Sequence, residues 1–207
     1  MSFRESRRTE AVEPFYVMEI LARARQLESE GRSIVHMEIG EPDFDTPEPI
    51  VEAGVEALRE GRHHYTPALG LPELRSRIAD HYMERYGKHV SAGRIVITPG
   101  SSGALQLLVA LLVNPGDEVL MADPGYPCNR HFVRLFEGKT VHIPVGADTG
   151  FQLTADLVDR QWSDDSCVVM ISSPSNPTGT VIDEGELERI ATLVDERGGT
   201  LIVDEIY

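Results

Sequence analysis

Residues 167–172 read C-V-V-M-I-S, and residues 200–206 read T-L-I-V-D-E-I. Both are short apolar runs rich in β-branched residues, which is typical of strands buried in a sheet. Similar runs lie upstream, at 94–98, 118–122 and 140–145. Helical patterns separate the runs, at 102–113, 127–137 and 184–197. Strands that alternate with helices predict an α/β fold with a mainly parallel sheet and flanking helices.

The amino-terminal part of the chain predicts helices with little sheet. Helices are expected at 15–30, 48–60 and 71–86, and a strand near 34–39. Thr46-Pro47 is typical of a helix start, with a threonine cap followed by proline at the first helical position. The segment 40–47, G-E-P-D-F-D-T-P, is rich in proline and aspartate and is expected to be irregular.

The composition excludes several classes of partner. The chain has 207 residues and a net charge of -15, and an acidic surface repels nucleic acid and anionic membranes. The most apolar stretch, 104–113, is too short to span a bilayer, and the charged amino terminus predicts no signal peptide. Cys128 and Cys167 are far apart in sequence, which favours a reducing, cytoplasmic location without disulfides.

Four polar segments are expected beyond the carboxyl ends of strands, where parallel α/β sheets form their sites. They lie at 100–103, 123–126, 172–179 and 204–207. The first, G-S-S-G, begins a helix whose N–H groups and partial positive charge suit a phosphate, or its serines simply cap that helix. In the second, D-P-G-Y, the tyrosine could stack on a flat cofactor, or it is a half-buried turn residue.

The last two segments supply Asn176, Asp204 and Tyr207. Asn176 could hydrogen-bond a phenolic oxygen, although S-N-P-T-G also has ideal turn composition. Asp204 ends an apolar run, where a carboxylate needs a cation or a donor. A protonated pyridine nitrogen would serve, as would a helix cap or a salt bridge. Tyr207 could reach the edge of the same ring. The histidines show no metal-ligand spacing, so no metal site is predicted.

Taken together, these segments resemble the class I/II aminotransferases of pyridoxal-phosphate (PLP) fold type I. The resemblance runs from about Phe15 to Tyr207 and includes Y-T-P-A-L-G-L-P-E-L-R at 65–75. It implies pyridoxal 5'-phosphate as cofactor, amino acid and 2-oxo acid as substrates, and a homodimer. The Gly40 backbone would meet the substrate carboxylate, and Tyr65 would reach the cofactor phosphate of the neighbouring subunit.

The resemblance also assigns the remaining candidates. Ser101 and Ser102 would hold the cofactor phosphate, and Tyr126 would stack on the pyridine ring. A further trio would contact the edge of the ring: Asn176 and Tyr207 at the ring oxygen O3′, and Asp204 at the ring nitrogen. Asp204 would keep that nitrogen protonated, which lets the ring accept the charge released at the substrate Cα.

The family's Schiff-base lysine has no counterpart here. The chain has Lys88 and Lys139, and neither lies in the family's motif. The resemblance therefore predicts an inactive amino-terminal fragment of an aminotransferase. Residues 1–45 would form the amino-terminal arm and part of the small domain. Residues 46–207 would form the first portion of the PLP-binding large domain, an incomplete fold.

Other functions stay open at this level. The same motifs occur with a PLP-dependent C–S lyase or cyclopropane-forming synthase, because they bind the cofactor and do not decide the reaction. A non-catalytic PLP-binding domain is a further alternative, either a lysine-free pseudo-enzyme or the effector domain of a transcription regulator.

The resemblance also predicts strand pairing. The runs at 118–122, 140–145, 167–172 and 200–206 should form a four-stranded parallel sheet. The run at 94–98 should stay outside it, with its backbone groups unpaired.

Overall fold

The computed structural model describes residues 4–12, 14–41 and 44–207. It divides into two compact units, one joining Met1–Pro14 to Pro99–Tyr207 and the other comprising Phe15–Thr98. Pro42 and Asp43 of the segment G-E-P-D-F-D-T-P lie outside the described residues. The predicted domain boundary after residue 45 stays a prediction.

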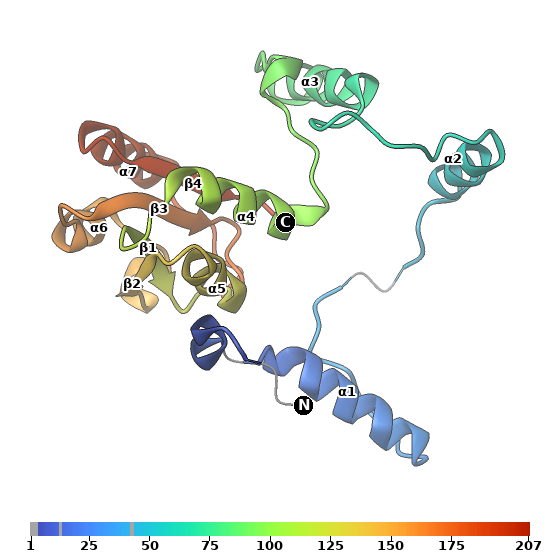
Figure 1. Cartoon of the computed structure of the whole chain (residues 1–207), viewed down its shortest axis with the longest axis horizontal. Helices are drawn as coiled ribbons and strands as arrows, with labels where there is room; N and C mark the ends of the chain where they lie inside the picture. Colours follow the sequence, from blue (N-terminus) through green and yellow to red (C-terminus); the bar gives the residue numbers. More distant parts are fainter. Residues whose placement is uncertain (1–3, 13, 42–43) are drawn as a thin grey trace. The chain divides into compact units, whose positions relative to one another are not determined.

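The first unit is built on a four-stranded parallel sheet (Figure 1). The strands lie in the order β2-β1-β3-β4. Their bounds are β1 (Glu118–Asp123), β2 (Lys139–Pro144), β3 (Ser166–Ser172) and β4 (Thr200–Asp204). The register pairs Ser172 with Asp204, so β3 and β4 end side by side. The predicted four-stranded sheet is confirmed, although β4 ends at Asp204 instead of residue 206.

Helices cover both faces of this sheet. On one face α4 and α5 pack against Val119, Val168 and Ile202; on the other α6 and α7 pack against Leu120 and Val169. The bounds are η1 (Arg7–Ala11), α4 (Gly100–Leu112), α5 (Pro127–Leu135), η3 (Ala147–Thr149), α6 (Ala155–Gln161) and α7 (Glu184–Glu196). Because successive strand residues point to opposite faces, a sheet buried on both sides needs continuous apolar runs. The sequence patterns missed α6, which is only seven residues long.

The second unit contains α1 (Tyr16–Ser29), α2 (Glu48–Arg59), α3 (Pro72–Tyr86) and η2 (Ala92–Arg94). The three predicted α-helices are confirmed within two residues at each end. The predicted threonine cap of α2 is wrong. The residue preceding α2 is Pro47, which is extended and offers no capping side chain, and the proline in the first turn is Pro49.

The strands predicted at 34–39 and 94–98 are wrong, because neither segment is paired in a sheet. The expectation of unpaired backbone at 94–98 is wrong as well. Ile97 N–H donates to the Leu69 carbonyl at 3.1 Å, and the Arg75 guanidinium donates to the Ile95 carbonyl at 2.8 Å. A loop and one arginine therefore satisfy peptide groups that a neighbouring strand would otherwise bind.

Within the described residues, no helix is both long enough and apolar enough to cross a membrane.

Candidate functional site

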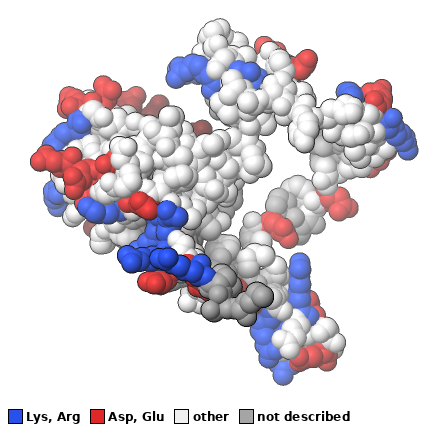
Figure 2. All heavy atoms as spheres, viewed as in Figure 1, with Lys and Arg blue, Asp and Glu red and all other residues white. Residues whose placement is uncertain are grey.

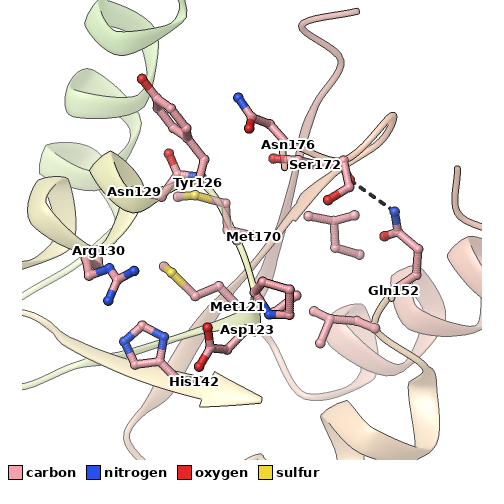
Figure 3. A pocket seen from close by; sticks show the side chains of 16 residues that line it. Met121, Asp123, Tyr126, Asn129, Arg130, His142, Gln152, Met170, Ser172 and Asn176 are labelled. Carbon is pink, nitrogen blue, oxygen red and sulfur yellow. Dashed lines mark hydrogen bonds between the residues drawn. The ribbon is translucent and has the colours of Figure 1, made fainter. Parts of the chain in front are cut away.

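The ends of β1, β3 and β4 each pass into a polar segment, as the sequence predicts. A pocket in the first unit is lined by the segment after β1, by Ser172 at the end of β3, and by Ser175 and Asn176 beyond it (Figure 3). In Figure 3 the Tyr126 ring and the Asn176 amide lie at the same end of this pocket. The fold thus brings together two candidates that are fifty residues apart in sequence.

Tyr126 stands on a tight turn after β1. A Cβ atom on Gly125 would lie 2.7 Å from the Ala122 carbonyl oxygen, so the turn closes only around glycine. The pKa of Tyr126 is raised to about 12 by its hydrogen bond with Cys128, by burial, and by the nearby Tyr207 and Asp204. The phenol is therefore protonated at neutral pH, and three predicted residues share one electrostatic environment.

The loop that carries Asn176 is held by hydrogen bonds. The Ser175 N–H donates to the Thr180 carbonyl, and the Gly179 N–H donates to the Ser175 carbonyl, both at 2.8 Å. The buried Gln152 side chain also donates to the Thr180 carbonyl at 2.8 Å. These contacts fix the loop from two sides, so Asn176 is presented from a rigid support.

Asp204 is the last residue of β4. Burial raises the pKa of its carboxyl group, and the Ile206 backbone N–H opposes that shift by donating a hydrogen bond to it. Within the part of the chain that the structure describes, no Lys, Arg or His forms an ion pair with Asp204. Neither the salt bridge nor the helix cap considered from sequence is present there. A half-buried carboxylate without a cation suits a cationic or N–H-bearing ligand.

Ser101 lies in a groove beside Asp204, formed by the start of α4 and the end of β4. Helix α4 begins at Gly100, whose φ is +75°, and its N-cap residue is Pro99. The serine-capped start considered from sequence is therefore wrong, because the residue at the cap position is a proline that makes no side-chain cap hydrogen bond. The N–H groups in the first turn of a helix suit an anion. The segment G-S-S-G follows no strand in the described residues, contrary to expectation.

Gly40 and Tyr65 belong to the second unit. Tyr65 is fully exposed, and the backbone at Gly40 has open space around it. Their predicted contacts with substrate and cofactor stay predictions.

Sequence reasoning missed two buried polar residues that line the pocket, Gln152 and Asn129. Asn129 is 5% exposed, and its Oδ1 atom has no hydrogen-bond partner among the described residues. The pattern of α5 offered a signal, because Asn129 shares the inward face of the helix with Phe132 and Val133. Within the described residues, no group of three or more His, Cys, Asp or Glu side chains is placed to hold a metal.

Comparison with known proteins identifies relatives along nearly the whole chain. The family model described as aminotransferase class I and II matches residues 32–207. The (5-formylfuran-3-yl)methyl phosphate transaminase of Methanocaldococcus jannaschii is 42% identical over 202 residues, which are 98% of this chain and 51% of that protein. The valine–pyruvate aminotransferase of Mycobacterium tuberculosis is 40% identical, over 95% of this chain and 50% of that protein.

Solved structures agree with this chain in fold. An aminotransferase from Mycobacterium tuberculosis matches with a TM-score of 0.94 and 39% identity, over 100% of this chain and 53% of that one. The aspartate aminotransferase from Thermus thermophilus with maleate matches with a TM-score of 0.94 and 34% identity, over 100% of this chain and 54% of that one. The chain spans about half the length of the curated relatives it matches.

Proposed function

This chain belongs to the class I and II aminotransferases, and from that premise we propose that the whole protein transfers an amino group between an amino acid and a 2-oxo acid. The names of its relatives support this reaction. The observation that carries the proposal is the half-buried Asp204 carboxylate, which has no cationic partner in the described residues and lies in one electrostatic environment with Tyr126 and Tyr207.

Pyridoxal 5'-phosphate fits this arrangement. When bound, PLP supplies an electron sink for the charge released as a proton leaves the substrate Cα. Its protonated pyridine nitrogen would be a cationic partner for Asp204. The Asp204 carboxylate would hold the proton at that nitrogen, because a nearby negative charge raises the pKa of the ring nitrogen.

The other residues of the first unit have positioning roles in this proposal. The Asn176 amide and the Tyr207 hydroxyl would donate hydrogen bonds to the ring oxygen O3′. The Tyr126 ring would stack on the cofactor. Ser101 and Ser102 would bind its phosphate at the start of α4, where the positive end of the helix dipole favours an anion.

The remaining roles depend on a second subunit and on the substrate. Tyr65 would contact the phosphate of the partner subunit's cofactor in a homodimer, and its full exposure here is compatible with that role. The Gly40 backbone would meet the substrate carboxylate. We propose a cytoplasmic location, which the free thiols of Cys128 and Cys167 support.

The substitution Asp204→Asn tests the proposal in the whole enzyme. We expect kcat/KM to fall by more than about tenfold, or ~1.4 kcal/mol of barrier, while the protein stays folded. Because burial raises the pKa of Asp204, its folded-state pKa exceeds the unfolded value. Ionisation of Asp204 therefore lowers stability as pH rises above 3.8, and Asp204→Asn should not be less stable than the parent at pH 7.

The matched control is Asp164→Asn, which makes the same charge change at an exposed residue in the turn before β3. This control should leave kcat/KM unchanged. A near-native rate in Asp204→Asn, with PLP still bound, would remove Asp204 from the reaction.

A further inference from the structure

A groove between α5 and β2 concentrates positive charge on an acidic protein. Its lining contains Arg130, His131, Arg134, Lys139, Thr140 and His142. Among the described residues that line it, none is acidic, whereas the whole chain has 34 acidic against 19 basic residues. In Figure 2 blue Lys and Arg atoms and red Asp and Glu atoms are interspersed over the visible face of the first unit. The groove therefore carries a local charge opposite to that of the molecule.

The arginines of this groove stand one helical turn apart. Arg130 and Arg134 are related by four residues on α5, so they lie on the same face of the helix. Figure 3 shows the Arg130 guanidinium beside the His142 ring of β2, with the Asp123 carboxylate next to them. Arg130 and His142 also line the pocket that contains Tyr126, so groove and pocket share one wall.

Positive charge in the groove is incompletely balanced. Burial and the positive charges of Arg130 and Arg134 lower the pKa of His142, and the negative charge of Asp123 opposes this shift. Lys139 has a partner in Asp165 at 3.7 Å. Arg130 is half-buried, yet it has no ion pair and no side-chain hydrogen bond among the described residues. A guanidinium in this position can donate a pair of hydrogen bonds to an incoming anion.

We propose that the α5–β2 groove binds the phosphoryl group of a small molecule. The oxygens of a phosphoryl dianion can accept hydrogen bonds from both the Arg130 guanidinium and the His142 imidazole, and Arg134 adds positive charge nearby, whereas a carboxylate would satisfy only one guanidinium fork. The proposed cofactor-phosphate residues, Ser101, Ser102 and Tyr65, contribute nothing to this groove. The groove is therefore separate from the proposed cofactor-phosphate residues, although it shares Arg130 and His142 with the pocket that contains Tyr126.

Phosphate titration of the whole protein, followed through the NMR signals of the His142 ring, tests the proposal. Inorganic phosphate, glycerol phosphate and acetate are each added at constant ionic strength with chloride as the balancing anion. We expect saturable shifts with the phosphates, a rise in the pKa of His142, and no saturation with acetate. Tighter binding of glycerol phosphate would identify an organic phosphate as the ligand, and tighter binding of inorganic phosphate would identify the free ion.

Arg130→Gln should weaken phosphate binding by about tenfold, since one charge-assisted pair of hydrogen bonds is lost. Arg130→Lys should restore part of the affinity, because it keeps the charge and loses the fork. The matched control is Arg160→Gln, an exposed arginine in the last turn of α6, which should bind phosphate as the parent does.

Near-ultraviolet circular dichroism of each variant checks whether it keeps the parent fold. Equal phosphate affinity in the parent and Arg130→Gln, or equal responses to phosphate and acetate, would mean an adventitious ion only and would overturn the proposal.

Discussion

The two units of this chain differ in how they use apolar residues. Sheet and helices of the first unit enclose two clusters of fully buried side chains, among them Leu120, Val169 and Ile190. In the second unit, Ala24 is the sole buried hydrophobic side chain among the described residues. Amphipathic helices form in both units, so helical periodicity alone does not produce a core.

Exposed apolar residues show the same difference between the two units. Val35 and Met37 of the second unit are more than four-fifths exposed, and Leu58 of α2 is 67% exposed. Burial needs a second layer of structure, which the sheet provides in the first unit. Stability should therefore be concentrated in the first unit, because helices derive most of theirs from tertiary packing.

Paired leucine substitutions test this contrast with the largest expected effect. Leu120→Ala should lower the free energy of unfolding by about 2–5 kcal/mol, because it leaves a cavity in the core. Leu58→Ala, in α2, should change it by less than about 0.5 kcal/mol. Urea unfolding is followed by Trp162 fluorescence, which reports on the core of the first unit, and by far-ultraviolet circular dichroism. Equal costs at the two positions would contradict the contrast.

Two glycine-to-alanine substitutions should change the free energy of unfolding in opposite directions. A Cβ atom on Gly199 would collide with the Trp162 ring and lie 3.1 Å from the Cys167 carbonyl oxygen. Gly199→Ala should therefore destabilise by about 1–3 kcal/mol. Gly54, within α2, has open space around it, so Gly54→Ala should stabilise the protein by about 0.5–1 kcal/mol. Thermal unfolding measures both variants, and a stabilising Gly199→Ala would show that the core there is loosely packed.

The smallest effect on stability is expected from the protonation of two histidines, one in each unit. His36 is hydrogen-bonded to Glu38 at 2.6 Å and to Glu28 at 2.9 Å, and these carboxylates raise its pKa above 6.5. Burial and the nearby arginines lower the pKa of His142 below 6.5. His36 should therefore stabilise the fold at low pH and lose that contribution as pH rises through its folded-state pKa. His142 should show the opposite dependence: it stabilises the fold above pH 6.5 and loses that contribution as pH falls below 6.5.

NMR titration of the ring protons measures both midpoints. Glu28→Gln should lower the midpoint of His36 and leave that of His142 unchanged. Midpoints in the reverse order would show that the two histidines lie in surroundings other than those described.

Sequence patterns predicted most of the helices, the four paired strands and the polar segments at the strand ends. These features depend on the period of apolar residues along the chain, which a single sequence displays. The same pattern singled out Asn176, Asp204 and Tyr126 as candidates, since each lies at or just beyond the end of an apolar run.

Tertiary structure alone decided which extended segments became strands and which polar residues face the pocket. Residues 34–39 and 94–98 have strand composition but no neighbouring strand, and pairing with a neighbour is what makes a strand. Asn129 and Gln152 are ordinary polar residues in sequence and become pocket residues only through packing against distant segments. Whether Asp204 caps a helix, forms a salt bridge or lies without a cationic partner likewise depended on its spatial neighbours. Hydrogen-bond partners and burial are set by residues far away in sequence, so local patterns do not contain them.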